Sequence, residues 1–481
     1  MKYTSTRNNK ASVSSARAVI DGMSADGGLY VPESFPALDY GSLGDDYAER
    51  AERVLSCFFD FDVEGIAERA YDGFDGDPAP VVKIDDGLFV LELWHGKTCA
   101  FKDMALSVLP GLLTRAKERE NEKNETLVLV ATSGDTGKAA MSGFTDVEGT
   151  QVCVFYPTDG VSAVQKLAMQ THKGNNVRAV GIRGNFDDAQ AAVKNAFADK
   201  SLEAVLKGKN IVLSSANSIN IGRLVPQIAY YFSAYKDLAD GGEIENGEKI
   251  DFVVPTGNFG NILAGLYAKR MGLPIEKLVC ASNRNNVLTD FITTGVYDVN
   301  REFFKTESPS MDILVSSNLE RLLFEVSGRD ADLTAARMAE LKSTGRYEVS
   351  KEELGQIREL FDCGYADDGE IEAAIADMFD EYGYLIDTHT AAAYVVAKRR
   401  GYPRKTVVVS TANPYKFAPA VLKALGLPSD GEVTAKTLEA LEDETAMEIP
   451  QPLLSVFTDP VRFDAVIDKD EIISYVKDNY K

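Results

Sequence analysis

Short apolar runs alternate with amphipathic stretches through most of the chain. Apolar runs bounded by turn residues are typical of buried strands, whereas apolar positions that recur with helical spacing predict helices. The strands that this pattern predicts lie at 127–130, 152–156, 177–182, 211–213, 251–254, 278–281 and 406–410. Helical stretches separate them at the spacing of right-handed βαβ units, so we expect an α/β fold with mostly parallel sheets.

Helical periodicity also dominates several regions outside this alternation. The predicted helices lie at 13–20, 45–75, 161–169, 186–198, 220–235 and 262–270. Residues 300–380 are mostly helical and acidic with little strand signal, and we interpret them as a helical insertion on the sheet scaffold. A chain of 481 residues is too long for one small core, so its length predicts two or three domains.

The charge balance limits the partners. A formal net charge of −23 at pH 7 argues against nucleic acid and anionic membranes. No apolar run approaches membrane-spanning length, and residues 1–7 lack the apolar stretch of a signal peptide. An anionic substrate would require local positive potential from lysines, arginines or backbone N–H groups, against the field of the whole protein.

The five cysteines and three histidines show neither a disulfide nor a metal pattern. The cysteines are scattered and include no C-x-x-C pair, which is typical of reduced thiols in a cytosol. The histidines have no metal-ligand spacing. We therefore expect a cytoplasmic protein without a metal site.

Lys102 is the first candidate for chemistry, because it lies where a predicted loop meets a predicted helix. A lysine in such a place commonly extends its ammonium group to water. In a buried site its pKa would instead fall, since burial disfavours the charged form, and the neutral amine would act as nucleophile and base in Schiff-base chemistry. The local sequence is compatible with both interpretations.

Two strand–loop–helix junctions have the composition of anion-binding loops. Glycines in residues 255–261 let backbone N–H groups and a helix N-terminus face a phosphate, although a tight turn without a ligand has the same composition. Residues 132–138 resemble a P-loop, but Thr132 replaces the first glycine and Ala139 the final Ser/Thr, so a P-loop NTPase is excluded. This second loop suits a carboxylate or a second phosphate, unless Thr132 or Asp135 merely caps the helix.

Two further polar clusters, 214–223 and 410–417, follow predicted strands. Ligands of open α/β sheets bind at the carboxyl ends of the strands, so both clusters are candidates for a site. For each cluster alone, helix capping and turn formation are the simpler explanation.

Together these motifs resemble threonine synthases, which are pyridoxal-phosphate enzymes of the tryptophan-synthase-β fold type. The matching segments occur in the family's order and cover nearly the whole chain: 1–7, 27–32, 101–103, 133–137, 257–261, 311–318, 387–391 and 411–417. The resemblance implies two open, twisted, mostly parallel sheets with flanking helices (fold type II). It also implies an N-terminal segment, 1–99, packed on the large domain, a smaller mobile α/β domain, 100–225, and a large cofactor-binding domain, 226–481, carrying the insertion.

The resemblance further implies a role for each candidate residue. Lys102 matches the catalytic lysine that binds pyridoxal 5'-phosphate covalently, and Thr411 matches the hydroxyl residue that faces the pyridine nitrogen. The loop around the cofactor phosphate matches Gly257, Asn258, Phe259, Gly260 and Asn261. The loop near the amino-acid end of the substrate matches Thr132, Ser133, Gly134, Asp135 and Thr136. The residues expected at the substrate phosphate are Asn217, Ser218, Asn220 and Arg223.

The implied reaction, the last step of threonine biosynthesis, converts O-phospho-L-homoserine and water to L-threonine and phosphate by γ-elimination and β-addition of water. The nearest alternative is another enzyme of this fold type, a threonine or serine dehydratase or a cysteine synthase; the alternative from another class is a non-catalytic phosphate-binding protein. Family members with this N-terminal region tend to be monomers, so the resemblance implies a monomer. They usually carry proline where this chain has Lys97, a lysine that we expect to point to solvent.

Overall fold

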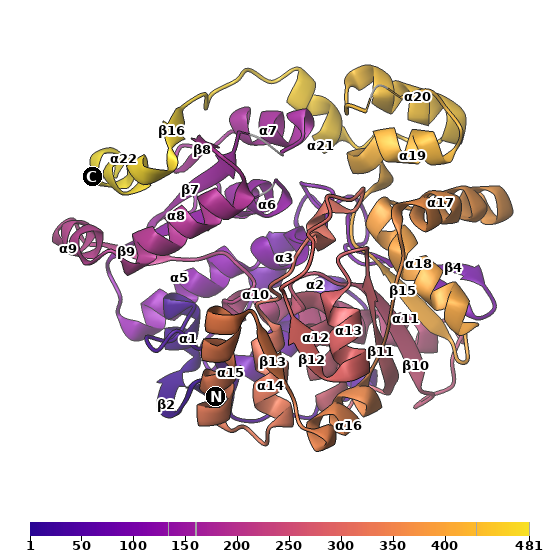
Figure 1. Cartoon of the computed structure of the whole chain (residues 1–481), viewed down its shortest axis with the longest axis horizontal. Coiled ribbons are helices and arrows are strands. Elements are labelled where there is room, and N and C mark those ends of the chain that lie inside the picture. Colours follow the sequence, from indigo (N-terminus) through magenta and orange to yellow (C-terminus); the bar gives the residue numbers. More distant parts are fainter. Residues whose placement is uncertain (133, 159–160, 430, 481) are drawn as a thin grey trace.

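Two separate sheets, each built mainly from parallel strands, carry the fold (Figure 1). The computed structural model describes residues 1–132, 134–158, 161–429 and 431–480. Every pairing between named strands of the two sheets is parallel, apart from one antiparallel edge strand. The predicted α/β fold with two mostly parallel sheets is therefore confirmed.

The five-stranded sheet is formed largely by the middle of the chain. Its strands, in spatial order, are β16 (Val466–Asp468), β8 (Val177–Arg183), β7 (Thr150–Pro157), β6 (Glu125–Ala131) and β9 (Ile211–Ser214). Nearly every residue of β6 and β7 is buried, as expected where both faces of a parallel sheet are covered. The helices of this region are α6 (Asp135–Phe144), α7 (Ala163–Gln170), α8 (Phe186–Ala198) and α9 (Lys200–Gly208). One apolar cluster joins the sheet to α8, α9 and the C-terminal α22 (Ile472–Asn479).

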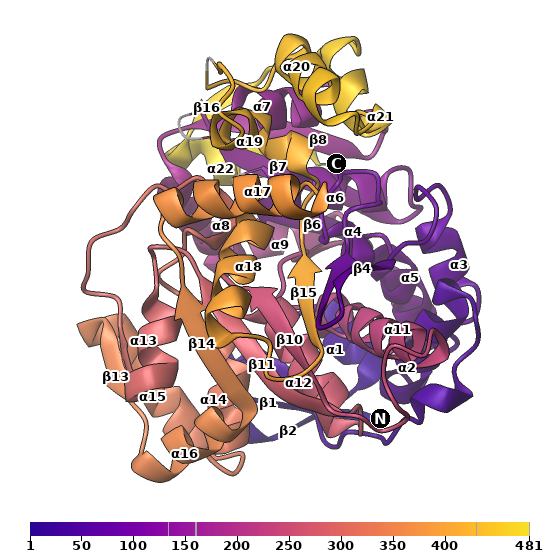
Figure 2. The ribbon, with the colours of Figure 1, turned by 90° about the vertical axis from the view of Figure 1, so that its right-hand side faces the viewer.

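The six-stranded sheet gathers strands from distant parts of the chain (Figure 2). Its strands, in spatial order, are β14 (Phe361–Tyr365), β11 (Ile275–Ser282), β10 (Ile250–Pro255), β15 (Thr406–Ser410), β5 (Leu88–Glu92) and the antiparallel β4 (Val81–Asp85). One face packs on α17 (Asp368–Tyr382), α18 (Thr388–Arg400), α19 (Ala418–Ala424) and α20 (Ala435–Thr445). The other face belongs to the largest core cluster, together with α11 (Pro226–Asp240), α12 (Gly260–Arg270) and α13 (Val287–Thr294).

The N-terminal segment packs on both parts of the molecule. Its elements are β1 (Lys2–Ser5), β2 (Asn8–Ser14), α1 (Ser15–Asp21), β3 (Tyr30–Pro32), η1 (Tyr40–Ser42), α2 (Tyr47–Phe58) and α3 (Ile66–Tyr71). Helix α1 lies against α5 (Leu109–Glu120), and α2 lies against α11. Buried side chains of this segment join the largest core cluster, so the segment is an integral part of the fold.

The stretch 300–380, expected to be a helical insertion, is mostly helical but also contains the strands β13 (Arg346–Glu348) and β14. Its elements are β12 (Val296–Asp298), η2 (Pro309–Met311), α14 (Leu319–Val326), α15 (Ala331–Thr344), β13 and α16 (Lys351–Leu360), followed by β14 and α17. Strand β14 pairs with β11 at the edge of the six-stranded sheet. Its sequence, FDCGY, has no run of β-branched residues, which is why the apolar pattern missed it.

Two predicted helices are divided. The stretch 45–75 forms α2 and α3, because the backbone is extended at Phe59, the C-cap of α2. The stretch 220–235 forms α10 (Ile221–Leu224) and α11, because Pro226 has no N–H to continue the helical hydrogen bonds. The chain then ends with η3 (Pro414–Phe417), α19, α20, α21 (Gln451–Leu454), η4 (Ser455–Phe457), β16, η5 (Lys469–Glu471) and α22. Within the described residues, no helix is long and apolar enough to cross a membrane.

Candidate active site

Lys102 lies in a tight turn that packs against the segment following β15. Helix α4 (Asp103–Leu106) begins at the next residue, and the Asp103 carboxylate accepts hydrogen bonds from N and Oγ1 of Thr98 at 2.7 and 2.8 Å. On the other side of the turn, Phe101 N donates to the carbonyl O of Thr411 at 2.9 Å. Strands β5 and β15 are parallel neighbours, so their carboxyl ends bring Lys102 and Thr411 to one edge of the sheet.

The ammonium group of Lys102 faces a buried carboxylate that a second lysine shares. Lys102 Nζ lies 3.7 Å from Asp135 Oδ2, and Lys416 Nζ lies 3.0 Å from Asp135 Oδ1. Burial lowers the pKa of Lys102, and the carboxylate of Asp135 only partly offsets this effect. Burial acts to raise the pKa of Asp135, but the two lysines outweigh it and hold that pKa below its usual range. The arrangement favours an ionised Asp135 beside an amine that loses its proton readily.

The loop between β10 and α12 forms a cradle for an anion. Phe259 has a left-handed backbone, with φ of 61°, and α12 begins at Gly260. A Cβ atom at Gly257 would lie 2.9 Å from the carbonyl O of Ser310, so a side chain there has no room. Backbone N–H groups at this helix N-terminus therefore lie in a loop that admits close approach.

Asn261 supplies an unused donor inside the same cradle. Its Oδ1 accepts hydrogen bonds from the hydroxyls of Tyr230 and Tyr231 at 2.6 and 2.7 Å, which orients the side-chain amide. Its Nδ2 is buried and has no hydrogen-bond partner among the described residues. Such a group is costly unless a bound molecule satisfies it. The residues present therefore fit pyridoxal 5'-phosphate, the cofactor that the sequence implies: a phosphate at this cradle, and an amine at Lys102.

The loop between β6 and α6 carries Asp135 into the site. The Thr132 hydroxyl accepts hydrogen bonds from N–H of Gly134 and Gly137, both at 3.0 Å, so it shapes the loop as the capping alternative anticipated. Gly134 has a φ of 142°, a conformation that favours glycine, and Gln165 donates to Asp135 Oδ1 at 3.1 Å. Ser133 lies outside the described residues. Thr136 is half-buried in the first turn of α6.

The four residues expected at the substrate phosphate differ in their contacts. Asn220 is taken up by the fold, because its side chain caps α10 through Gly222 N at 2.9 Å and donates to the carbonyl O of Val19 at 3.1 Å. Asn217 and Ser218 are half-buried. Arg223 is buried, donates to the carbonyl O of Ala216 at 2.7 Å, and has its pKa lowered to about 10 by burial. A buried guanidinium with a neutral partner is suited to an anion.

Sequence reasoning missed three residues that organise the site: Lys416, Asn318 and Arg321. Lys416 lies in a segment that the sequence had selected, and a lysine five positions after Thr411 was the available signal. Asn318 donates from its backbone N to the carbonyl O of Asn258 at 3.1 Å, which ties α14 to the loop between β10 and α12. Arg321 is fully buried and donates to the carbonyl O atoms of Tyr30 and Ile219 at 3.0 and 2.6 Å. Asn318 ends the matching segment 311–318, which was the available signal for it, whereas only its tertiary contacts identify Arg321.

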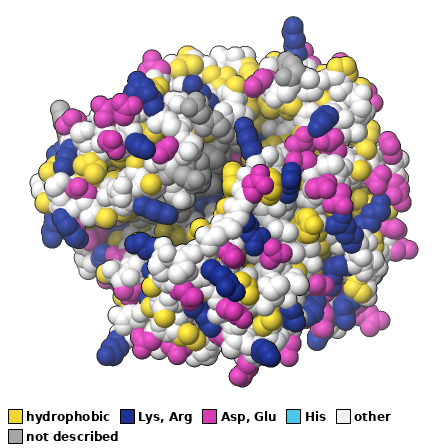
Figure 3. All heavy atoms as spheres, in the orientation of Figure 1, with side chains coloured by type: hydrophobic (Ala, Val, Ile, Leu, Met, Phe, Trp, Pro, Cys, Tyr) yellow, Lys and Arg dark blue, Asp and Glu magenta, His cyan; other side chains and the backbone are white. Residues whose placement is uncertain are grey.

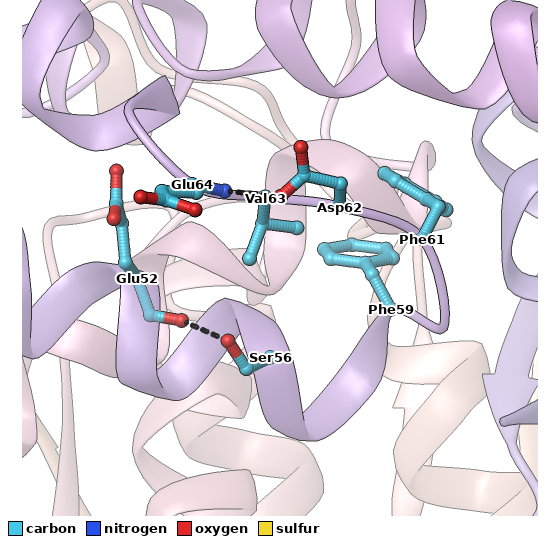
Figure 4. A pocket seen from close by; sticks show the side chains of 7 residues that line it. All are labelled: Glu52, Ser56, Phe59, Phe61, Asp62, Val63 and Glu64. Atoms are coloured by element: carbon cyan, nitrogen blue, oxygen red, sulfur yellow. Dashed lines mark hydrogen bonds between the residues drawn. The ribbon is translucent and has the colours of Figure 1, made fainter.

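Lys97 and a surface pocket are not part of this candidate site. Lys97 is exposed, which agrees with the solvent orientation expected for it. Figure 3 shows the molecule hollowed between the part with the five-stranded sheet and the rest. A different, surface pocket of about 260 Å³ lies on the N-terminal segment, lined by residues of α2 and the loop before α3 that include Phe59 and three carboxylates (Figure 4). No group of three or more His, Cys, Asp or Glu side chains in the described part of the chain is arranged to hold a metal ion.

Comparison with known proteins agrees with this geometry. A family model described as pyridoxal-phosphate dependent enzyme matches residues 77–412, and one described as threonine synthase N terminus matches residues 2–71. Human threonine synthase-like 1 is 40% identical over 453 residues, which cover 90% of this chain and 61% of that protein. The chain thus spans about three fifths of the length of this relative. Threonine synthase of Pseudomonas aeruginosa is 37% identical over 469 residues, 95% of this chain and 97% of that protein.

Solved structures give the same result. The structure of threonine synthase from Brucella melitensis, whose title describes it as PLP bound, has a TM-score of 0.88, with 36% identity over 99% of each chain. Threonine synthase from yeast has a TM-score of 0.86, with 30% identity over 99% of this chain and 98% of that one. The chain therefore belongs to the threonine synthase family of pyridoxal-phosphate-dependent enzymes.

Proposed function

We propose that this protein is a threonine synthase, a carbon–oxygen lyase that converts O-phospho-L-homoserine and water to L-threonine and phosphate. The observation that carries the proposal is the meeting of Lys102, the cradle at 257–261 and Thr411 at one sheet edge, with the carboxylate of Asp135 3.7 Å from Lys102 Nζ. Burial lowers the pKa of Lys102, which suits an amine that must attack a carbonyl and exchange protons.

The same edge holds the cofactor in this proposal. Pyridoxal 5'-phosphate, joined covalently to Lys102, supplies an electron sink for the carbon atoms of the substrate. Gly257 to Asn261 bind the cofactor phosphate through backbone N–H groups and the free Nδ2 of Asn261. Thr411 faces the pyridine nitrogen with a neutral hydroxyl, which does not enforce protonation of that nitrogen. When the substrate amine takes its place, the freed amine of Lys102 would accept the α-proton of the substrate and return a proton to the product.

The substrate lies between the two anion loops. Residues 132–136 bind its amino-acid end, with the N-terminus of α6 and the hydroxyl of Thr136 directed to the carboxylate. Arg223, Ser218 and Asn217 bind its phosphate, and Asn220 holds that loop by capping α10. A buried guanidinium provides the local positive potential that a protein with a net charge of −23 needs for a phosphorylated substrate.

Lys102→Ala tests the central assignment. The loaded wild-type protein should absorb at about 410–430 nm, the usual range of the covalent lysine–cofactor bond. Lys102→Ala should lose this band and its turnover, whereas Lys97→Ala, which changes an exposed lysine of the same segment, should keep both. Near-normal turnover of Lys102→Ala would refute the role of Lys102.

Product analysis separates the proposal from its rivals. Threonine synthase activity releases phosphate from O-phospho-L-homoserine and forms threonine, whereas a dehydratase forms a ketoacid from threonine or serine. A non-catalytic phosphate-binding protein would bind phosphate without the visible band. Ketoacid as the main product, with no phosphate release, would support the dehydratase instead.

Location, assembly and domain division are also part of the proposal. All five cysteines are free, and burial raises the pKa of Cys99, Cys153 and Cys280 to about 12, which suits a reducing cytoplasm.

We propose a monomer, which light scattering should detect as the mass of one chain. We also propose that residues 100–225, together with 466–479, whose strand β16 pairs with β8, move relative to the rest of 226–481 during turnover.

A further inference from the structure

Asp135 is held between two lysines that come from different parts of the fold. Asp135 begins α6, Lys102 immediately precedes α4, and Lys416 lies in η3 after β15. The carboxylate is 3.0 Å from Lys416 Nζ and 3.7 Å from Lys102 Nζ. The side chains of Asp135, Lys102 and Lys416 are 6%, 12% and 9% exposed, so water screens these charges weakly.

Lys416 is anchored to the turn that carries Lys102. Its ammonium donates to the carbonyl O of Thr98 at 2.8 Å, and Thr98 in turn donates to the Asp103 carboxylate next to Lys102. Lys416 therefore has a fixed place from which it fastens Asp135 to this turn. Burial acts to lower the pKa of Lys416, but Asp135, Cys99 and Asp103 together raise it above its usual value, which favours the charged ammonium.

Several other titratable groups act on Lys102, Asp135 and Lys416. Arg223 of α10 acts on Lys102 with the same sign as Lys416. Asp135 also faces His389 at the start of α18, and Lys416 also faces Asp103 and the thiol of Cys99. Lys138, one turn into α6, faces Asp103 and Lys416. Among the groups that act on Lys102, Asp135 opposes the two cations.

We propose that Lys416 offsets the Asp135 carboxylate at Lys102, so that the Lys416–Asp135 pair sets the protonation of the Lys102 nitrogen. Gln165 also donates to Asp135 Oδ1 at 3.1 Å, so the carboxylate keeps a partner when Lys416 is replaced. The inference rests on the proposed role of Lys102 as the lysine that carries the cofactor. The pair is neutral overall, and Lys416 offsets part of the effect of Asp135 on Lys102. The lysine nitrogen can then gain and lose a proton within one turnover.

The two members of the pair must act on Lys102 with opposite signs. Loss of Lys416 leaves Asp135 free to stabilise positive charge on the lysine nitrogen, so the pKa of that nitrogen should rise. Loss of the Asp135 charge leaves Lys416 unopposed, so the pKa should fall. Loss of both should give a pKa between those of the two single variants. A partner that merely supports the fold gives no such sign reversal.

The test is a pH titration of the visible absorbance of the cofactor-loaded protein, without substrate. We expect Lys416→Met to raise the titration midpoint and Asp135→Asn to lower it, each by about one to three pH units, with the double variant between them. Lys423→Met makes the same charge change on an exposed lysine of α19, which pairs with Glu307 at 3.0 Å, and should leave the midpoint unchanged.

Each contrary result has a defined meaning. If Lys416→Met leaves the midpoint in place but raises the KM for O-phospho-L-homoserine, Lys416 binds the substrate and the charge-pair model is wrong. If both single variants shift the midpoint in one direction, the charge-pair model is also wrong. If Lys102→Ala keeps the visible band, the failure lies in the proposed function itself. Should Asp135→Asn fail to bind the cofactor, the comparison of Lys416→Met with Lys423→Met still decides the sign.

Discussion

Asn318 Nδ2 donates to Ser218 Oγ across 3.1 Å, and this hydrogen bond joins the two phosphate regions of the proposed site. The backbone N of Asn318 meanwhile donates to the carbonyl O of Asn258 at 3.1 Å. One asparagine on the entry to α14 therefore contacts the loop proposed for the cofactor phosphate and the loop proposed for the substrate phosphate. Arg321 orients the Asn318 side chain, because its guanidinium donates to Asn318 Oδ1 and also to the carbonyl O of Ile219.

Asn318→Ala should weaken the substrate-phosphate site more than the cofactor-phosphate site. The variant removes the side-chain hydrogen bond to Ser218, worth about 0.5–1.5 kcal/mol, and leaves the Arg321 guanidinium with one partner fewer. Alanine keeps the backbone N–H that donates to the carbonyl O of Asn258. We expect the KM for O-phospho-L-homoserine to rise by about threefold to tenfold, with a smaller loss of cofactor affinity. Spectrophotometric cofactor titration and initial rates measure the two effects. A loss of cofactor affinity with an unchanged KM would contradict this assignment.

Gly257→Ala should selectively weaken cofactor binding. Its Cβ would meet the carbonyl O of Ser310 at 2.9 Å, and that backbone atom must move. We expect a loss of about tenfold in cofactor affinity, measured by titration of the apo-protein. The matched control is Gly355→Ala in α16, where a Cβ meets nothing within 4 Å. That change should leave cofactor affinity unaltered and stabilise the helix by about 0.5–1 kcal/mol.

Arg223→Met should damage substrate binding without damaging the fold. Arg223 is a buried cation, and a buried charge with few partners is often replaced by an apolar residue at no cost in stability. We expect a KM increase of at least about tenfold, weaker inhibition by phosphate, and an unfolding free energy equal to or above that of the wild type. Asn220→Ala is the contrasting variant: loss of its cap should cost about 1 kcal/mol of stability. A destabilised Arg223→Met with an unchanged KM would show that the arginine is structural.

His172 should make the protein sensitive to acid. Lys138 Nζ lies 2.8 Å from His172 Nδ1, and Thr145 Oγ1 lies 2.8 Å from Nε2. Because the Thr145 hydroxyl donates its proton to the carbonyl O of Met141, the ring must be neutral, with Nε2 donating and Nδ1 accepting from the lysine. Burial, followed by the charge of Lys138, lowers the pKa of His172 to about 3.

The depressed pKa fixes the direction of the effect. In the unfolded chain, His172 binds a proton near its ordinary pKa of about 6.5. In the folded protein it stays neutral until the pH falls to about 3. The contribution of His172 to stability is therefore complete above pH 6.5 and is lost as the pH falls toward 3. Between pH 6.5 and 5 the loss is about 2 kcal/mol. His172→Gln should flatten this part of the stability profile, measured by denaturant unfolding at each pH. An unchanged slope would contradict the neutral ring.

The sequence predicted much of the fold because strand and helix periods are local properties. The buried strands, from 127–130 to 406–410, were recognisable as apolar runs between turn residues, and their alternation with helices implied parallel sheets. Strand β14 escaped because an edge strand needs no continuous β-branched run. The return of β16 to the five-stranded sheet escaped because pairing partners lie far apart in sequence.

At the site, the sequence by itself determined which residue types stood at strand ends: a lysine at 102, a glycine-rich loop at 257–261 and a hydroxyl at 411. Only the tertiary structure decided that Lys102 is buried beside Asp135, that Lys416 shares this carboxylate, and that Asn220 serves as a helix cap. The physical reason is that reactivity depends on burial and on charges within a few ångströms. One of those neighbours, Lys416, lies far from Lys102 in the sequence, and folding alone brings it to the carboxylate that faces Lys102.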